Sequence, residues 1–237
     1  MKRIFLEEIP STNDYAKARR KDKENLLVVA KRQTGGRGTK GRNFSSGTGG
    51  VYLSRLEFYE NFPAKDAFRI MQGAAAAVCE TLSSFGVTPQ IKWPNDVYVN
   101  GKKICGILIE NTFCGYLISS SVVGIGLNVC NRLPVELSSI ATSLCLETGK
   151  EIGVDEVVER LLEVWGRENI HERYAQYLGW LGEEITLIIG ENEGKIEATL
   201  LSVDSEGGLW ACVDGKEKRF VAAEVSLRVA NSAEEEL

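Results

Sequence analysis

Short apolar runs alternate with polar turns along the first part of the chain. Residues 26–30, 51–58 and 116–126 read as strands because they are apolar and rich in β-branched side chains. Between positions 63 and 86, apolar residues recur at helical spacing, which predicts an amphipathic helix that ends at a glycine. Asn100-Gly101 lies between two β-type runs and predicts a tight hairpin. Together these patterns predict an α+β fold with a mixed or largely antiparallel sheet.

The pattern changes in the second half of the chain. Ser138 or Ser139 is expected to cap a short helix that ends at Gly149, and a longer helix is expected over 155–178. From 184 to 228, short β-like runs alternate with turns at positions 191–192, 206–208 and 214–215, which predicts a small all-β barrel. We therefore expect a larger domain over 1–181 and a small C-terminal domain over 182–237.

Composition narrows the class of protein. The chain has 237 residues, of which 43% are hydrophobic and 26% charged, as is usual for a soluble globular protein. No apolar run is long enough to span a membrane, and the first residues do not form a secretory signal. These features predict a cytoplasmic protein. The formal net charge of −5 argues against a general nucleic-acid binder.

Cysteine and histidine usage argues against two kinds of site. The six cysteines include no CxxC pair and His171 is the only histidine, whereas a structural zinc site needs closely spaced ligands of these types. Most of the cysteines lie in apolar runs and are expected to be buried, reduced thiols. His171 lies in a polar helical stretch, which makes it a poor base for a Ser–His or Cys–His hydrolase.

A glycine-rich segment follows the first predicted strand. Gly36, Gly38 and Gly41 satisfy a GxGxxG pattern, but residues 43–50 cannot form the helix that a dinucleotide site requires. Arg42 stands where a phosphate-binding P-loop has lysine. Glycines and arginines on one loop still suit anion binding. A solvated basic loop is the alternative.

Four other segments carry polar residues that either a ligand or the fold itself would explain. Residues 11–14 read as a helix N-cap, and Lys92 to Asp96 contain a turn with nucleotide-binding or Mg²⁺-binding side chains. Lys103 borders an apolar strand, where it is either solvated or aimed at an anion. Glycines at 124 and 126 indicate close approach of a ligand or backbone, and Asn128 needs a polar partner.

The order and spacing of these segments resemble those of the biotin–protein ligase family. The resemblance extends from Ser11 to about Arg228. It is carried by Ser11-Thr12-Asn13, Gln33-Thr34-Gly35-Gly36-Arg37-Gly38, Lys92-Trp93-Pro94-Asn95-Asp96, Lys103 with Gly106-Ile107-Leu108, Gly124-Ile125-Gly126-Leu127-Asn128, and Glu224-Val225-Ser226-Leu227-Arg228.

The resemblance implies a fold and a reaction. The fold is a catalytic domain like that of class II aminoacyl-tRNA synthetases, followed by an SH3-like β-barrel. The activity is that of a biotin–[biotin carboxyl-carrier protein] ligase. Biotin attacks ATP to give biotinyl-5′-AMP and pyrophosphate, and a lysine of a biotin carboxyl carrier protein then takes the biotinyl group. Mg²⁺ is implied on the phosphates.

The resemblance also implies roles for individual residues. Arg37 and Lys103 are the implied catalytic pair, since two anions must be held in near-attack geometry. The implied biotin-binding residues are Ser11, Thr12, Asn13, Gln33, Gly36, Arg37, Gly38, Thr39, Lys103, Gly106, Leu108, Gly124 and Gly126. The implied ATP-binding residues are Arg42, Lys92, Asn95, Asp96, Asn128, Glu224 and Arg228. The Mg²⁺ ligands are not indicated.

Three positions depart from the family pattern. Thr39 replaces an arginine that helps to retain the adenylate, so we expect weaker retention and some untargeted acylation of lysines. Phe44 replaces a tryptophan, and Pro10 stands where an acidic residue is common.

The resemblance also bears on binding partners and leaves two alternative functions to consider. The family contains homodimers, and some members carry a DNA-binding domain that precedes the catalytic pattern. That pattern begins here by Ser11, so no binding to DNA or membranes is expected. The rival enzyme is a lipoate or octanoate ligase, which shares the adenylate chemistry. A biotin sensor without catalytic activity is the alternative from another class, and intact Arg37 and Lys103 argue against it.

Overall fold

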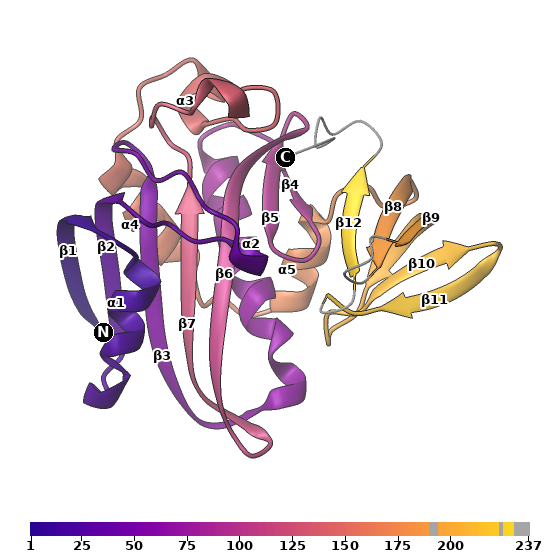
Figure 1. The fold of residues 1–237 in the computed structure, drawn as a ribbon, viewed down its shortest axis with the longest axis horizontal. Coiled ribbons are helices and arrows are strands. Elements are labelled where there is room, and N and C mark those ends of the chain that lie inside the picture. The colour runs from indigo at the N-terminus through magenta and orange to yellow at the C-terminus, as the bar shows by residue number, and fades with distance from the viewer. Residues whose placement is uncertain (190–193, 223–224, 230–237) are drawn as a thin grey trace.

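Seven strands form a mixed sheet at the centre of the larger part of the molecule (Figure 1). The computed structural model describes residues 1–189, 194–222 and 225–229. The strand order is β1-β2-β3-β7-β6-β5-β4, and only the edge pair β1–β2 is parallel. The strands are β1 (Lys2–Ile9), β2 (Leu26–Gln33), β3 (Val51–Pro63), β4 (Pro89–Lys92), β5 (Asp96–Val99), β6 (Lys102–Cys114) and β7 (Leu117–Leu127).

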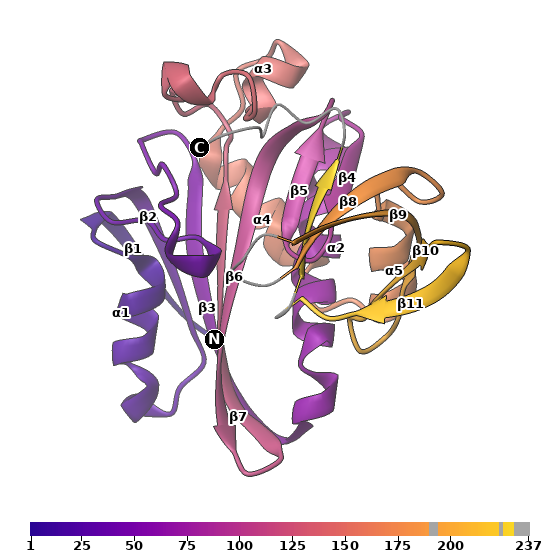
Figure 2. The same cartoon turned by 45° about the vertical axis from the view of Figure 1, so that its right-hand side comes forward.

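Helices cover the two faces of this sheet unequally. The short helix α1 (Thr12–Ala18) lies on one face, and α2 (Phe68–Ser84), α4 (Val154–Val164) and α5 (Ile170–Tyr177) lie on the other (Figure 2). Because side chains alternate along a strand, β2 contributes to both faces. Leu26 and Val28 pack toward α1 in a small apolar cluster, whereas the intervening residues join the large core around α2.

The C-terminal strands form a second, smaller sheet, as expected. They are β8 (Glu184–Ile189), β9 (Gly194–Val203), β10 (Leu209–Val213), β11 (Lys216–Phe220) and β12 (Val225–Val229), all antiparallel in the order β11-β10-β9-β8-β12. Over the described residues the edge strands β11 and β12 do not pair, so this sheet is open and the expected closed barrel is not found. Its apolar side chains join the large core, and Trp93 Nε1 donates to the carbonyl of Gly207 at 3.1 Å. The division of the chain at residue 181 stays a prediction.

A turn prediction is confirmed, and two helix predictions are wrong. The hairpin turn is confirmed, because Asn100 and Gly101 have φ of 50° and 74°. The short helix α3 (Leu144–Thr148) is capped by Ser143, not by Ser138 or Ser139, which follow a 3-10 turn at Val135–Leu137. The long helix predicted over 155–178 is two helices, α4 and α5, because Gly166 and Asn169 adopt left-handed conformations between them. Further 3-10 turns occupy Arg20–Asp22, Thr39–Gly41 and Ala64–Asp66.

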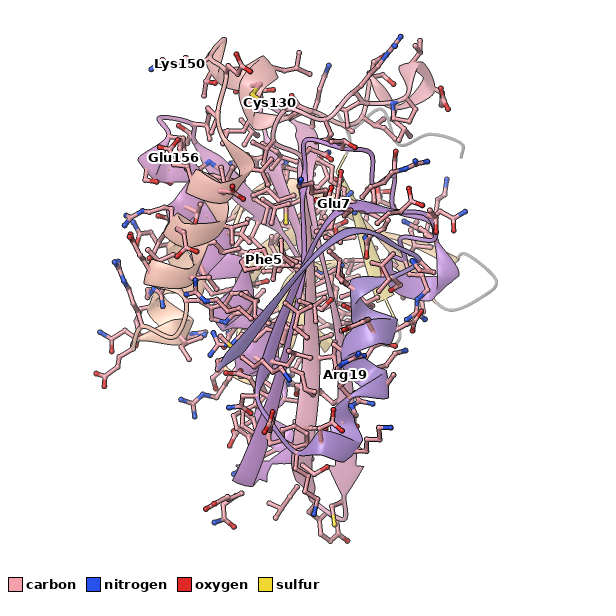
Figure 3. All side chains as sticks on the ribbon, turned by 90° about the vertical axis from the view of Figure 1, so that its left-hand side faces the viewer. Phe5, Glu7, Arg19, Cys130, Lys150 and Glu156 are labelled. Atoms are coloured by element: carbon pink, nitrogen blue, oxygen red, sulfur yellow. A yellow bond between two sulfur atoms is a disulfide. The ribbon has the colours of Figure 1, made fainter. Side chains whose placement is uncertain are left out.

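Four of the six cysteines are free and two form a disulfide. Of the free thiols, Cys79 and Cys105 are buried, as expected, Cys212 is partly buried and Cys114 is exposed. Cys130 and Cys145 instead form a disulfide, with their Cα atoms 5.2 Å apart, that joins the end of β7 to α3 (Figure 3). The expectation of reduced thiols is therefore wrong for this pair. Within the described ranges, no group of three or more His, Cys, Asp or Glu side chains is placed to hold a metal ion.

Two further findings concern the helices. His171 Nδ1 lies 3.0 Å from Nε2 of Gln72, so the only histidine links α5 to α2 inside the fold and does not reach a catalytic partner in the described part of the chain. None of the helices in that part is long and apolar enough to cross a membrane.

Candidate functional site

A pocket opens on the α1 face of the sheet, where the glycine-rich loop crosses β3, β6 and β7. Its empty space, including the open mouth, is about 700 Å³. It is lined by Ser11, Thr12, Asn13, Gln33, Arg37, Gly38, Thr39, Arg42, Asn43, Phe44, Leu53, Asn95, Asp96, Lys103, Gly106, Ile107, Leu108, Gly124, Ile125 and Gly126. Most of the residues predicted from the sequence therefore meet in one pocket, although they come from positions 11 to 126.

Uncharged polar side chains are fixed at one end of this pocket. Ser11 caps α1 by accepting from the backbone N–H of Asp14 at 3.3 Å. Gln33 Oε1 accepts from both the backbone N–H and the hydroxyl of Thr12, at 2.8 and 3.0 Å. The Gln33 amide nitrogen donates to the Ser46 hydroxyl at 3.0 Å. These bonds fix side chains that present hydrogen-bonding atoms to a neutral, polar ligand group.

Ser54 on β3 supports this end, and sequence reasoning missed it. Its hydroxyl is fully buried and lies 2.8 Å from Oγ1 of Thr12 and 2.5 Å from Oδ1 of Asn13. Gly124 leaves the space for this arrangement, because a Cβ there would lie 2.1 Å from Oδ1 of Asn13. A serine within the apolar run of residues 51–56 was the available signal.

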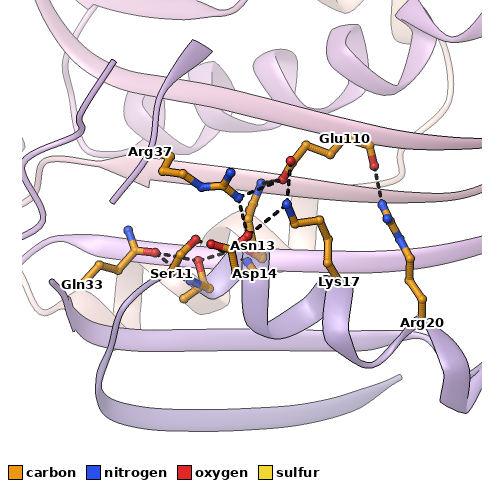
Figure 4. Close-up of polar contacts among 10 residues, drawn as sticks. Ser11, Asn13, Asp14, Lys17, Arg20, Gln33, Arg37 and Glu110 are labelled. Atoms are coloured by element: carbon orange, nitrogen blue, oxygen red, sulfur yellow. Dashed lines mark hydrogen bonds and ion pairs between the residues drawn. The ribbon is translucent and has the colours of Figure 1, made fainter. Parts of the chain in front are cut away.

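A charge cluster of Asp14, Lys17, Arg37 and Glu110 borders the same end (Figure 4). Arg37 Nη2 lies 2.5 Å from Oδ1 of Asp14 and 3.5 Å from Oε2 of Glu110. Lys17 Nζ bridges the two carboxylates at 2.9 and 2.8 Å. Asn13 Nδ2 also donates to Glu110, at 2.9 Å. The cluster therefore links the polar end of the pocket to the arginine of the glycine-rich loop.

Glu110 is the most constrained acid of the cluster. Burial acts to raise the pKa of its carboxyl group, but hydrogen bonds from Lys17 and Asn13 and the nearby cationic charges outweigh burial and lower it. Its backbone carbonyl accepts from Arg20 at 2.8 Å. Glu110 ends the apolar run of β6, and a charged residue in that position was the signal that could have identified it.

The glycine-rich loop is held against the sheet by Phe44. A Cβ at Gly126 would lie 2.6 Å from the Phe44 ring, and a Cβ at Gly106 would lie 3.4 Å from it. Gly36 is buried against Ser46 and the backbone of Phe44, so it shapes the loop and does not line the pocket. The loop contains a 3-10 turn but no α-helix, which agrees with the rejection of a dinucleotide site.

The other end of the pocket carries a lysine and a carboxylate. Lys103 Nζ pairs with Oδ2 of Asp96 at 2.7 Å. Asn95 Nδ2 contacts the second carboxylate oxygen of Asp96 at 3.2 Å and the carbonyl of Ile107 at 3.1 Å. The backbone of Lys103 bonds to that of Ile140 and Thr142, which fixes its strand. Lys103 and Arg37 thus provide two cations on the wall of a single pocket.

Two of the predicted ATP-side residues, Lys92 and Asn128, do not line the pocket. Lys92 is buried, and its ammonium contacts the Tyr98 hydroxyl at 3.2 Å. The Asn128 side chain bonds to the carbonyl of Thr142 and to Asn131, both at 3.0 Å, so protein partners account for it. Glu224 and the side chain of Arg228 lie outside the described residues.

Comparisons with known proteins agree with this geometry. Residues 5–128 match the biotin/lipoate A/B protein ligase family. The bifunctional ligase/repressor BirA of Bacillus subtilis is 34% identical over 86% of this chain and 66% of its own length. A biotin–[acetyl-CoA-carboxylase] ligase of Paracoccus denitrificans is 28% identical over 77% of this chain and 82% of its own.

A solved structure extends the similarity to the whole fold. The biotin protein ligase of Aquifex aeolicus, determined in complex with biotin and ATP, superposes with a TM-score of 0.75. The two proteins are 32% identical, over 96% of this chain and 98% of that one. The family match, these relatives and the shared fold show that the chain belongs to the biotin/lipoate A/B protein ligase family.

Proposed function

We propose that this protein activates biotin with ATP to biotinyl-5′-AMP and transfers the biotinyl group to a lysine of a biotin carboxyl carrier protein. The observation that carries the proposal is a single pocket whose wall combines the cations of Arg37 and Lys103 with uncharged, hydrogen-bonding side chains. Biotin combines a neutral bicyclic head with a carboxylate, and these two chemistries match the two kinds of wall. The Aquifex relative was solved with both biotin and ATP.

The cations support the first chemical step. A carboxylate and a triphosphate repel each other, so the reaction needs positive charge where they meet. In the proposal, Arg37 and Lys103 hold the biotin carboxylate and the α-phosphate together. A carboxylate oxygen bonds to the α-phosphorus and pyrophosphate leaves. Arg42, Asn95 and Asp96, which line the pocket, are the proposed ATP-side contacts.

The second step transfers the biotinyl group. The deprotonated amine of the carrier lysine attacks the carbonyl carbon of the mixed anhydride, forming an amide and releasing AMP. The pocket is open at its mouth, which gives a carrier lysine a route to the anhydride. A carboxylase carrier domain is the proposed partner, since the Paracoccus relative is named for acetyl-CoA carboxylase.

Mg²⁺ is proposed as part of the ATP complex and not as a metal held by the protein alone. Asp96 is the only carboxylate that lines the pocket over the described residues, and it is paired with Lys103. One paired carboxylate does not fit a dedicated site for a hard cation that prefers several oxygen ligands. Mg²⁺ on the phosphates would neutralise charge on the leaving pyrophosphate.

The cellular setting is proposed from composition. We propose a cytoplasmic enzyme that acts without operator DNA, because its net charge is −5.

ATP–pyrophosphate exchange tests the proposed activity. Purified protein is incubated with ATP, labelled pyrophosphate and, in turn, biotin, lipoate or octanoate. Exchange with biotin alone is expected. Exchange with lipoate or octanoate instead would keep the adenylate chemistry but replace the acid. Biotin binding without any exchange would support the sensor without catalytic activity and contradict the proposal.

A further inference from the structure

Arg37 is already bound by a carboxylate of the protein. Its Nη2 donates to Oδ1 of Asp14 at 2.5 Å, the shortest of its contacts in the charge cluster (Figure 4). An arginine that holds a substrate carboxylate would use the same donors. The carboxylates of Asp14 and of the ligand would therefore bind the same guanidinium group.

Because the Arg37–Asp14 pair is exposed, replacing one of its partners costs little free energy. The side chains of Arg37 and Asp14 are 39% and 52% exposed. Exposed ion pairs contribute little to stability, and a ligand carboxylate can replace one partner of such a pair without burying an unpaired charge.

The charge balance of the cluster points the same way. Asp14 and Glu110 balance Lys17 and Arg37, so the described cluster is neutral when the pocket is empty. A carboxylate arriving at Arg37 adds a third negative charge. Asp14 keeps Lys17 as its partner, at 2.9 Å, when Arg37 turns toward the ligand. The cluster thus has a second stable pairing available.

We propose that Asp14 competes with the substrate carboxylate for Arg37 and thereby sets the affinity of the pocket for its acid. The inference rests on the proposed function, which places the biotin carboxylate at Arg37. It makes Asp14 a specificity-determining residue that lowers affinity for a charged acid and leaves affinity for the neutral head unchanged.

Glu110 cannot take this role in the same way. Its side chain is only 26% exposed, and it accepts from both Asn13 and Lys17. Removing it would disturb the polar end of the pocket as well as Arg37. Asp14 contacts only the two cations of the cluster through its side chain in the described structure, so Asp14→Asn isolates the competition.

Calorimetry with biotin and its neutral primary amide tests the inference. Asp14→Asn is expected to tighten biotin binding by about three- to fivefold, the upper part of the range for an exposed ion pair. Binding of the amide, which has no carboxylate for Arg37, is expected to stay within about twofold. Glu159→Gln is the matched control, because it breaks an exposed arginine–carboxylate pair between Glu159 on α4 and Arg3 on β1.

Two results would overturn the inference. Biotin binding that is unchanged or weaker in Asp14→Asn removes the competition, and equal tightening for biotin and its amide shows a general change of the pocket. The gain must also vanish when Asp14→Asn is made in an Arg37→Ala background, as a double-mutant cycle requires. Wild-type protein that binds no biotin would overturn the proposed function as well, so the two failures are distinguishable.

Discussion

The two faces of the seven-stranded sheet are built from alternate residues of the same strands, yet they bury different chemistry. The face toward α2, α4 and α5 carries a large apolar core that continues into the second sheet. The face toward α1 carries a small apolar cluster around Ala16 and, beside it, buried Ser11, Thr12, Asn13 and Ser54. The comparison indicates that the face toward α2, α4 and α5 provides most of the stability, whereas the face toward α1 can accommodate a polar pocket.

The largest expected effect is a loss of stability caused by a substitution on the apolar face. Leu82 on α2 is fully buried, so Leu82→Ala should lower the free energy of unfolding by about 3 kcal/mol through lost burial and a cavity. KM for biotin should stay unchanged in the fraction that remains folded. Chemical denaturation measures the stability. Leu146→Ala is the control, since Leu146 is 70% exposed. Equal losses in both variants would contradict the comparison.

The second largest effect is a loss of catalytic rate caused by a substitution on the polar face that leaves the core unchanged. Lys103→Ala should reduce kcat/KM of biotin-dependent exchange by about 10², the usual consequence of losing a preorganised charge. The midpoint of denaturation should change little, because the Lys103 side chain is one third exposed. Lys102→Ala is the control, since Lys102 donates to the carbonyl of Ser138 at 2.8 Å and does not line the pocket. Similar kinetic losses in both variants would count against the proposed site.

A smaller effect concerns acid sensitivity, which we expect at Glu110. Its pKa is lowered in the folded state, so its contribution to stability is present above the unfolded pKa and is lost as pH falls through the folded pKa. At pH 7, Glu110→Gln should cost about 1.5 kcal/mol, the lower end of the range for hydrogen bonds to a charged group. The stability gap between wild type and variant should close on acidification below the ordinary carboxyl range. A gap that is independent of pH would show that charge plays no part.

The smallest effect concerns the loop above the polar face. Thr39 lines the pocket, and Thr39→Arg would add a cation near the proposed adenylate. We expect severalfold less labelling of a non-carrier protein, measured by biotin blotting after incubation with biotin and ATP. Thr34→Arg is the control, because Thr34 is exposed on the same loop but outside the lining. Wild-type protein that labels no more than Thr39→Arg would remove the idea of weak adenylate retention.

Features that depend on neighbouring residues could be predicted from the sequence. The Asn100-Gly101 turn and the strands around it require only local conformation and alternation. The break between α4 and α5 was missed although the polar run of residues 166–169 signals it, because Gly166 and Asn169 there adopt left-handed conformations that end one helix and begin the next. The helix cap at Ser143 was missed because nearby serines offered the same local signal.

The support of the pocket depends on partners that are distant in sequence. Ser54 meets Asn13 across 41 positions, and Glu110 meets Asn13 across 97. No local pattern encodes such contacts. Asn128 illustrates the same limit: the sequence showed that it needs a partner, and only the structure identified Thr142 and Asn131 as partners. The resemblance to a family placed the pocket residues, whereas the side chains that position them came from the structure.

The packing of the Phe44 ring on Gly126 has a consequence for when the pocket can form during synthesis. The ring and the glycine that receives it are 82 positions apart in the chain, since 126 minus 44 is 82. At a synthesis rate of about 5–20 residues per second, the glycine-rich loop leaves the ribosome roughly 4–16 seconds before Gly126 does. During that interval the loop and Phe44 lack the strand that fixes them. The uncharged polar end of the pocket, although most of it is synthesised first, is therefore completed only when β7 is made.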